Sequence, residues 1–487
     1  MLISRNKILL LVLSALSVIS DSFAITSLAK NDPDPVYTSL DPHTFLYTRK
    51  KLQLKGYDVI PDRREYFGVS ISPFGQNSDI GNNAAGIPVN LGDVNGPWDM
   101  LTLVYGNLPI NQSLPPILTQ AQLQIFPGGA GLNNPDYVDL NCKVGFFTIP
   151  MVYRKRGVRF EFDANIIDDF GISVQTGVTD MSQTLSAQGC FLGTLQGFIN
   201  ETVPVINYNS SIATPPAVVP GTAGDLWLGN SGCEPGISIC AINKFLMDQL
   251  NPIAQAINLD IDNFHTVSIE EVRLNAYWRH AFGFNTHTDD DWPEFLLIPF
   301  FQASGSLSPG TRVNPNKAFA PTFGDNGFNA AGFNTGINFD FFDTIEIGAE
   351  FGWTHFFKRD CVNIRMPNSP FQTGIYPFTT NVNYQPGDNW NFGAKIAAYH
   401  FIDRLSMYFQ WMLVEHRRDK ICLVQADPAF LPHVLEEISD WKLQVANVGF
   451  NYDIAPYVSL GFFWQAPLNQ HNVYKCTTVM LSLNGSY

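Results

Sequence analysis

The last third of the chain repeats one pattern: a run of alternating apolar and polar residues, a turn of three or four residues, and a second alternating run. The runs 332–339 and 344–354, joined by the turn 340–343, show it most clearly. Successive side chains of a β-strand point to opposite faces, so each run has one apolar and one polar face. The repetition predicts an all-β fold built from antiparallel hairpins.

Alternation alone is compatible with two architectures. Along 344–357, Phe351 and Trp353 share one face while Glu346 and Glu350 share the other. A water-soluble sandwich would turn the apolar face inward, whereas a transmembrane barrel would turn it toward lipid and leave the charged face on the lumen. The choice therefore depends on features outside the strands.

The N-terminus favours the barrel. Arg5 and Lys7 precede an apolar run over 8–19, and Ser-Phe-Ala at 22–24 is typical of a cleavage site. The run is shorter than the roughly 20 apolar residues that a membrane-spanning helix needs. We therefore predict a cleavable signal peptide over 1–24, and we interpret 25–62 as a periplasmic N-terminal extension.

Composition points the same way. Only 15% of the residues are charged while 13% are aromatic, which leaves a long secreted chain poor in ordinary solvated surface. The formal net charge of −15 argues against nucleic acid as a partner. Lipid contact would account for the shortage of charged surface.

The C-terminal strand supplies the third feature. Val479, Leu481, Leu483 and the final Tyr487 fall on one face of it. In this the sequence resembles Gram-negative bacterial outer-membrane β-barrel proteins of the porin type, whose last strand commonly ends in an aromatic residue read by the assembly machinery. The resemblance implies an outer-membrane location and contact with the barrel assembly machinery, outer-membrane lipid and lipopolysaccharide. A homo-oligomer is a further option.

The hairpin pattern predicts a transmembrane antiparallel up-and-down barrel over 63–487, with about 12 strands. The predicted strands are 66–74, 145–166, 170–178, 268–284, 294–304, 328–339, 344–357, 389–400, 404–416, 441–452, 456–466 and 474–487. If Arg154-Lys-Arg-Gly157 forms a tight turn and 98–126 adds a strand, the count is 14.

Short connections alternate with long ones, as in outer-membrane barrels. The largest predicted outer loops are 75–144 and 179–267, and the second holds a helical pattern at 237–250. Pro150 and Pro299 lie inside predicted strands and predict bulges. Aromatic residues near both strand ends predict two interfacial girdles. These are Phe284, Phe339, Phe401, Tyr452, Tyr457 and Tyr487 at one end, and Trp353, Trp390, Trp411, Trp441 and Trp464 at the other.

The cysteines fall in predicted outer loops or at outer strand ends. In an oxidising compartment this pattern predicts disulfides, with Cys233, Cys240, Cys361 and Cys422 as candidates. Cysteines in barrel loops also look like the chlamydial major outer-membrane proteins, an architectural resemblance without a shared motif. The total of 7 is odd, so one thiol is left over within the chain.

The sequence contains no recognisable catalytic motif, and we expect no enzyme activity, metal or cofactor. Charged residues instead fall on the polar faces and would line the lumen. These pore-lining candidates are Arg159, Glu161, Asp163, Glu271, Arg273, Arg279, Glu346, Glu350, Lys395 and Lys442. Inward charges require water or partners.

The main hypothesis from these residues is a channel for passive diffusion of small hydrophilic solutes, with opposed acidic and basic residues setting a transverse field. A second hypothesis is a surface structural or adhesive barrel with a plugged lumen and disulfide-tied loops. A third is uptake of hydrophobic compounds, as in the 14-stranded fatty-acid transporters, although the N-terminal extension lacks their Asn-Pro-Ala motif.

Overall fold

The computed structural model describes residues 67–96, 98–99, 108–110, 112–113, 146–147, 150–167, 169–185, 250–286, 293–308, 314–318, 320–322, 324–341, 344–370, 372, 376–402, 404–455 and 457–486. The predicted signal peptide, the N-terminal extension and most of the loops 75–144 and 179–267 lie outside these residues. So do the alternating run 119–125 and nearly all of the helical pattern 237–250. Among the residues described, no helix is long and apolar enough to span a bilayer.

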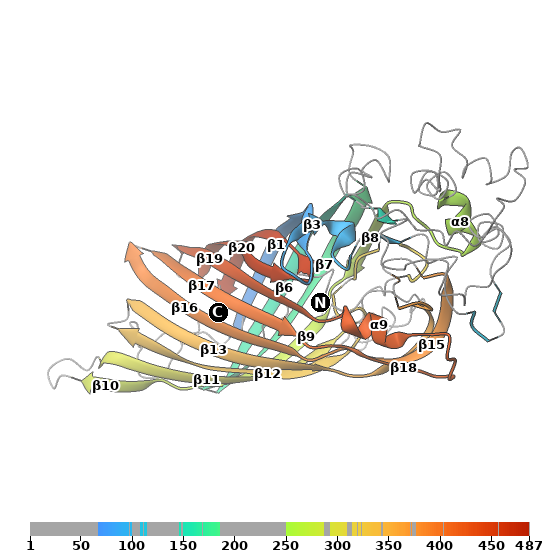
Figure 1. Ribbon diagram of the computed structural model, residues 1–487. Coiled ribbons are helices and arrows are strands. Elements are labelled where there is room, and N and C mark those ends of the chain that lie inside the picture. Colours follow the sequence, from blue (N-terminus) through green and yellow to red (C-terminus); the bar gives the residue numbers. More distant parts are fainter. Residues whose placement is uncertain are drawn as a thin grey trace, which may run out of the picture.

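The fold is a closed antiparallel barrel of 12 strands with two additional strands. The barrel strands are β1 (Phe67–Ser78), β6 (Met151–Ile167), β7 (Phe170–Leu185), β9 (Val272–Arg279), β11 (Pro293–Leu307), β12 (Ala330–Phe341), β13 (Ile345–Phe356), β16 (Asn389–Ile402), β17 (Leu405–His416), β19 (Trp441–Ala455), β20 (Val458–His471) and β22 (Thr477–Ser486). β9 pairs with both β7 and β11, which closes the barrel (Figure 1).

All twelve barrel strands correspond to strands expected from the alternation. The decisive segment is Arg154–Gly157, which continues through β6 without a turn and keeps its pairing with β1 and β7. The count is therefore 12 and not 14. The first and last strands pair directly, with Gly68 opposite Ser486.

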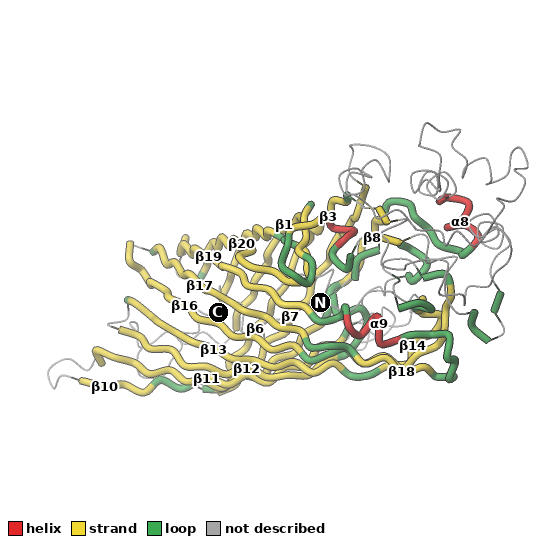
Figure 2. The backbone as a smooth tube through the Cα atoms, viewed as in Figure 1, coloured by secondary structure: helices red, strands yellow, loops and turns green. Residues whose placement is uncertain are grey.

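The two ends of the barrel differ. Short connections join β6 to β7, β12 to β13, β16 to β17 and β19 to β20 at one end, which we call the turn end. The connections from β1 to β6, β7 to β8, β11 to β12, β13 to β16, β17 to β19 and β20 to β22 lie at the other end, the loop end, which carries the additional sheets and helices. Figures 1 and 2 show this loop end on the right of the molecule.

The two additional strands, β8 (Phe264–Ile269) and β10 (Phe282–Thr286), continue the same chain run as β9. β9 and β10 are separated opposite Pro299. His280 N–H donates to Pro299 O at 3.3 Å, but Pro299 has no N–H to donate in return. The register stays in step on both sides of the gap, from Arg279–Phe300 to Phe282–Leu297. The bulge predicted at Pro299 is therefore wrong, because the proline only interrupts the ladder. Pro150 lies before β6 and outside the strand.

A real β-bulge separates β8 from β9. Val178 pairs with Ile269, but Gln175 pairs with Arg273, so the β8–β9 run contains one residue more than β7 over this stretch. Glu270 N–H donates to Gly177 O at 2.8 Å. A bulge places consecutive side chains on one face, and both Glu270 and Glu271 are buried.

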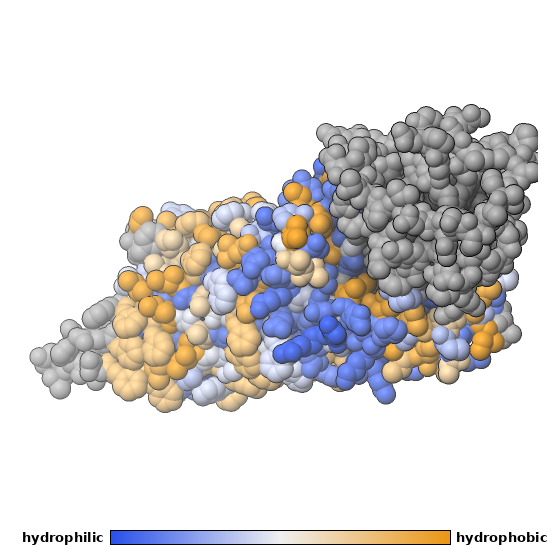
Figure 3. All heavy atoms as spheres, in the orientation of Figure 1, coloured by the Kyte–Doolittle hydropathy of each residue, from blue (hydrophilic) through white to orange (hydrophobic). Residues whose placement is uncertain are grey.

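The barrel is apolar outside and polar inside. On β1, Phe67, Val69 and Ile71 are exposed by 42–49%, whereas the intervening Ser70 and Ser72 are at most 2% exposed. The same alternation holds round the barrel, with exposed Phe, Ile, Leu and Val facing outward. Figure 3 shows these apolar residues covering the strands on its left side.

Most of the predicted aromatic girdles face outward. Phe284, Phe339, Tyr452, Tyr457 and Trp464 are exposed. Trp353, Trp390 and Trp411 are half-buried on the outward face. Trp441 is an error of the prediction: it is 2% exposed and points inward, where its ring stacks on His416 at 5.4 Å. The odd positions of β19 face the interior, which places Trp441 there. The Phe401 side chain and Tyr487 lie outside the described residues.

A cap covers part of the loop end. It contains a sheet of β14 (Arg359–Met366), β15 (Phe378–Gln385) and β18 (Lys420–Leu423), and the helix α9 (Pro432–Glu437). Inward-facing residues of β17 and β19, including Val414 and Leu443, pack against it in one buried apolar cluster. Smaller elements at the same end are β2 (Ile80–Asn82), β3 (Pro88–Asn90), η1 (Leu91–Asp93), β4 (Trp98–Asp99), β5 (Phe146–Phe147), α8 (Leu250–Ala256) and β21 (Val473–Tyr474).

Two of the disulfide candidates, Cys361 and Cys422, are not joined in a disulfide. Cys361 is buried in β14 and Cys422 is exposed in β18, with β15 between them. Neighbouring strands lie about 4.8 Å apart, so these cysteines are separated by roughly 9–10 Å, beyond the ~7 Å between Cα atoms that a disulfide tolerates. Cys476 forms no disulfide either. Cys142, Cys190, Cys233 and Cys240 lie outside the described residues.

Candidate functional site

The candidate site is the barrel interior, which has two dissimilar sides. One side, the charged wall, consists of inward-facing ionisable residues on β6 and on the β8–β9 run, with β7 between them. Its members are Lys155, Arg159, Glu161, Asp163, Glu270, Glu271, Arg273 and Arg279, each at most 7% exposed. Both signs of charge are interleaved on this wall.

Glu270 is the centre of the charged wall. Its Oε1 lies 3.1 Å from Lys155 Nζ, and its Oε2 lies 3.0 Å from Arg159 Nε. Arg159 Nη2 also donates to Oε1 at 3.2 Å, so the pair is bidentate. The guanidinium rests 4.1 Å above the ring of Phe74. One carboxylate therefore bridges two buried cations, an arrangement that offsets their desolvation.

Small residues on β7 allow these contacts. Glu270 and Arg159 belong to strands on opposite sides of β7, and Gly177 lies between them. A Cβ at Gly177 would come within 2.5 Å of Glu270 Oε2, so any larger residue would push the carboxylate away. The glycine is required for side chains to meet across an intervening strand.

Toward the turn end, the wall is organised by Tyr277. Its hydroxyl lies 2.8 Å from Asn165 Oδ1 and 3.1 Å from Asp163 Oδ1. The Arg279 guanidinium lies 5.8 Å from the Tyr277 ring. Polar contacts thus continue along the wall from Lys155 at the loop end to Arg279.

Glu271, the additional residue of the bulge, holds a turn from another connection. The Asp325 N–H donates to Glu271 Oε1, and the Ser306 hydroxyl donates to Asp325 Oδ2 at 2.8 Å. Gly324 has a φ of +51°, and a Cβ there would collide with the Glu271 carboxylate. The turn 324–327 is therefore fastened to the inner side of the barrel.

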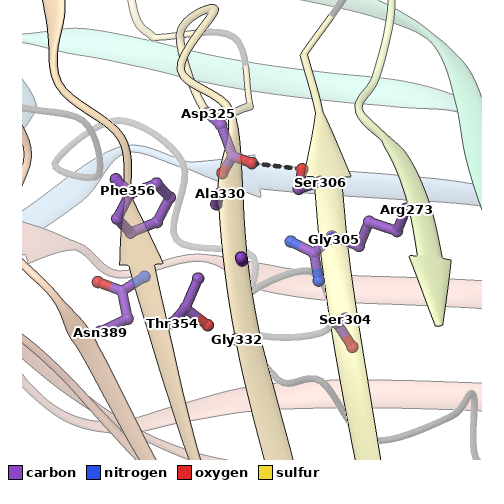
Figure 4. Close-up of a pocket in the computed structure, with 11 residues that line it drawn as sticks. Arg273, Ser304, Gly305, Ser306, Asp325, Ala330, Gly332, Thr354, Phe356 and Asn389 are labelled. Carbon is purple, nitrogen blue, oxygen red and sulfur yellow. Dashed lines mark hydrogen bonds between the residues drawn. The ribbon is translucent and has the colours of Figure 1, made fainter. Parts of the chain in front are cut away.

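Beside this turn lies a small cavity, shown in Figure 4. Arg273, Ser306 and Asp325 line one part of it, and Thr354 and Asn389 line another. Its volume is about 20 Å³, which is enough for about one water molecule.

The opposite side of the interior, the amide wall, is lined mainly by uncharged side chains. A continuous chain of hydrogen bonds, the amide belt, crosses it from β12 to β6. Asn334 donates to Glu350 at 3.2 Å, Gln410 to Glu350 at 2.6 Å, Asn447 to Gln410 at 3.0 Å, Gln465 to Asn447 at 3.1 Å, Thr478 to Gln465 at 3.4 Å, Gln76 to Thr478 at 3.1 Å and Tyr153 to Gln76 at 3.4 Å.

Glu350 sets the direction of the amide belt. An ionised carboxylate can only accept, so Gln410 must present its NH₂ group to Glu350 and its carbonyl oxygen to Asn447. The same orientation then passes to Gln465 and onward, and aligned hydrogen bonds polarise one another. Gly393 on β16 lets Glu350 reach Gln410, because a Cβ there would lie 2.3 Å from Glu350 Oε1.

Near the turn end, the amide wall includes an ion pair between β13 and β16. Lys395 Nζ lies 3.3 Å from Glu346 Oε1, and the Tyr399 hydroxyl donates to the same oxygen at 3.3 Å. Glu346 is 0% exposed and Lys395 is 8% exposed. This pair joins neighbouring strands, whereas the contacts of Glu270 on the charged wall reach across the intervening strand β7.

Nine of the ten pore-lining candidates face the interior: all except Lys442. Lys442 shares the outward face of β19 with the exposed Phe450 and Tyr452. The prediction assumed that polar residues stay on the inner face up to the loop end of β19. At that end polar residues lie on both faces of the strand.

Two members of the charged wall, Lys155 and Glu270, were absent from the predicted pore lining. Lys155 lies an even number of residues from Arg159, Glu161 and Asp163, so the alternation of β6 indicated its inward direction, but it belongs to the segment 154–157 for which a tight turn was also possible. Glu270 has the wrong parity for an unbroken strand, and only the bulge turns it inward. Two consecutive carboxylates in an alternating strand are the signal that could have indicated a bulge.

A buried arginine holds the cap and the connections together. Arg365 is 1% exposed, and it donates to Pro315 O, Tyr376 O and Ile257 O at 2.7–3.0 Å. Burial lowers the pKa of Arg365 to about 10. In the same cap, burial and then the neighbouring Asp419 raise the pKa of Tyr384, whose hydroxyl donates to Asp419. Both groups are held by a desolvated polar network.

Comparison with known proteins gives no family. No family model matches the chain, and no curated protein sequence matches it. Among solved structures it is similar to an outer-membrane channel from Pseudomonas putida F1, with 7% identity, a TM-score of 0.43, and coverage of 87% of this chain and 97% of that chain.

Two other solved structures show weaker likeness. The translocator domain of the autotransporter NalP from Neisseria meningitidis has 8% identity, a TM-score of 0.31, and coverage of 91% of this chain and 95% of that chain. The toluene transporter TbuX from Ralstonia pickettii has 10% identity, a TM-score of 0.31, and coverage of 90% and 93%. Values this low assign neither a family nor a function.

Proposed function

We propose that the chain is an outer-membrane β-barrel channel through which small hydrophilic solutes diffuse passively. The observation that carries the proposal is the polarity of the barrel faces. Exposed aliphatic and aromatic side chains cover the outside, and buried amides, hydroxyls and charges cover the inside. A closed barrel with this polarity is stable where its exterior meets hydrocarbon and all its strand edges are paired.

The polar interior supports transport of hydrophilic solutes. Burying charged groups costs several kcal/mol each unless water or partners compensate. The charged wall and the amide belt supply such partners along the wall itself, so each side chain lies against its neighbours. This arrangement offers solutes a continuous polar surface from the turn end to the loop end.

The narrow point of the proposed path lies at the turn 324–327. The apolar cluster under the cap extends from β17 and β19 to Phe356 at the end of β13 and Ala330 at the start of β12, which leaves the side of β9 and β11 for passage. There the cavity beside Asp325 and Ser306 has a volume of about 20 Å³, room for about one water molecule. Solutes larger than water then pass only when this turn moves away from Glu271.

The proposal is tested by refolding the mature chain in detergent and measuring conductance in planar bilayers and sugar uptake by liposomes. We expect discrete conductance steps from the wild type. Ser306→Ala and Glu271→Ala remove contacts to the turn 324–327, so both variants should conduct more than the wild type. Arg156→Gln, an exposed change on the outer face of β6, should leave conductance unchanged.

Two results would contradict the proposal. A barrel that inserts into liposomes, as shown by protection from protease, but passes neither ions nor sugars would exclude a channel. A mature chain that folds and stays monomeric without detergent would exclude membrane insertion itself. Unaltered conductance in Ser306→Ala and Glu271→Ala would refute only the assignment of the narrow point.

A further inference from the structure

An open hollow lies on the outer surface at the loop end, outside the barrel interior. Its volume is about 620 Å³, and its lining includes Arg417, Arg418, Asp440, Lys442 and His471. Figure 3 shows hydrophilic residues gathered where β17 and β19 run toward α9, to the right of the apolar strand surface.

The hollow is built on a regular part of the sheet. Glu415 pairs with Lys442, and Lys442 pairs with His471, so these side chains form one outward row across β17, β19 and β20. Behind the row, the inward-facing His416 and Trp441 stack on each other and are at most 2% exposed. The charged row therefore lies over a pair of buried, stacked rings.

The row lies directly at the edge of the apolar surface. On β17 the outward face carries Phe409 and Trp411 before it reaches Glu415. On β20 it carries Trp464 and Leu468 before His471, and both are more than 40% exposed. In a membrane barrel this transition from aromatic to charged residues is the level of the lipid headgroups.

The charges in the hollow favour an anion. Arg418 pairs with Asp440 at 3.7 Å, but among the residues that the structure describes neither Arg417 nor Lys442 makes an ion pair. Glu415 is the neighbouring carboxylate, so the hollow has a small excess of positive charge within a chain of net charge −15. Local cations in an acidic protein indicate a specific anionic ligand more than general attraction to an anionic surface.

We propose that this hollow binds a phosphate group of lipopolysaccharide, with Arg417 and Lys442 as its ligands. The inference rests on the membrane insertion in the proposed function, which places the loop end at the outer leaflet. A phosphate monoester carries more charge and more acceptor oxygens than the phosphodiester of an ordinary phospholipid. The hollow accommodates the phosphorylated headgroup of the lipopolysaccharide, and the acyl chains of the lipid lie along Trp464 and Leu468.

The experiment uses the full mature chain in a neutral detergent and native mass spectrometry. The probes are lipid A with its phosphates, dephosphorylated lipid A, phosphatidylglycerol and inorganic phosphate. We expect stable adducts with phosphorylated lipid A only. Arg417→Gln/Lys442→Gln should weaken this binding roughly 25-fold, and Arg417→Gln alone about fivefold, because each surface cation contributes about a factor of five.

The matched control is Arg154→Gln/Arg156→Gln, which removes the same charge from the exposed outer face of β6. We expect this control to keep the wild-type affinity for lipid A. An equal loss in both double variants would overturn the proposal in favour of general electrostatic attraction. Equal binding of dephosphorylated lipid A or of phosphatidylglycerol would overturn the assignment to a phosphate monoester, and binding of inorganic phosphate without lipid adducts would overturn the lipid source.

Folding of each variant is checked by its electrophoretic mobility before and after boiling. Conductance should be unchanged in Arg417→Gln/Lys442→Gln, since these residues are outside the barrel. A wild type that inserts and conducts but retains no lipid A would refute the lipid site and leave the channel intact. A wild type that does not insert would refute the channel first.

Discussion

The charged wall and the amide wall solve the same problem in different ways. Both keep polar side chains inside a closed barrel. The charged wall does so with strong pairs of opposite sign, concentrated at Glu270, Lys155 and Arg159. The amide wall does so with a series of weaker hydrogen bonds, each shared between neighbours, that ends at Glu350. The stabilising interactions are therefore concentrated at Glu270 on the charged wall and spread over many hydrogen bonds on the amide wall.

The arrangement of the two walls differs from the one on which the expected transverse field was based. The sequence suggested acidic and basic residues facing each other across the lumen. The structure instead places both signs on one wall, where they contact each other. Charges that neutralise one another at 3 Å produce little field across the pore, so we expect size and hydrogen bonding to determine passage more than charge separation.

The largest effect should come from Glu270→Gln. Losing the carboxylate that bridges Lys155 and Arg159 leaves two buried cations facing a neutral amide, which should cost about 3–5 kcal/mol of unfolding free energy. Urea unfolding of the refolded barrel in lipid measures this. Arg156→Gln, next to Lys155 but exposed, should change stability by less than about 0.5 kcal/mol. Equal effects of the two substitutions would refute the central role of Glu270.

Gln465→Leu in the amide belt should lower the unfolding free energy by less than Glu270→Gln does. The change removes the donor to Asn447 and the acceptor for Thr478, and a broken buried hydrogen bond costs about 1–3 kcal/mol. The same unfolding measurement applies, with the exposed Asn469→Ala on the same strand as control. A loss as large as that of Glu270→Gln would contradict the view that the belt distributes its energy.

The glycine that lets Glu350 reach Gln410 offers a matched pair of substitutions. Gly393→Ala puts a Cβ 2.3 Å from Glu350 Oε1 and should destabilise by about 1–2 kcal/mol. Gly305→Ala adds a Cβ with nothing within 4 Å and should be neutral or slightly stabilising. Gln410→Ala removes the hydrogen bond between Gln410 and Glu350. In that background, Gly393→Ala should lower the unfolding free energy by less than it does in the wild type. An unchanged penalty would mean that Glu350 does not depend on this glycine.

The smallest effect concerns ion selectivity. Inward carboxylates outnumber inward cations in the described residues, with Asp340, Glu346 and Glu350 against Lys395 on the amide wall. We expect weak cation preference, measured as a reversal potential across a salt gradient. Lys395→Gln should increase this preference, whereas the exposed Lys420→Gln in the cap should not. Anion preference of the wild type would contradict the assignment of these residues to the solute path.

Much of the barrel follows from local alternation, because a period of two identifies a strand and its two faces without knowledge of its neighbours. This is why the positions of all twelve strands and the inward position of Arg159, Asp163 and Glu346 were predictable, whereas the continuity of β6 was decided by its pairing with β1 and β7. The errors lie where alternation is interrupted, or near the loop end, where polar residues occupy both faces of a strand. Glu270 needs a bulge to turn inward, and Trp441 and Lys442 exchange their expected faces at the loop end.

The sequence by itself determined the class of fold, the positions of the strands and, over most of their length, which face of each strand is polar, but it left the count open between 12 and 14. Only the tertiary structure decided which inward residues meet. Glu270 and Arg159 are 111 residues apart in the sequence. Their side chains meet because Gly177, on the strand between them, leaves the space free. The same holds for Glu350 and Gln410 across Gly393. Alternation records the direction of each side chain, but contact across a barrel wall depends on closure and stagger, which no single strand encodes.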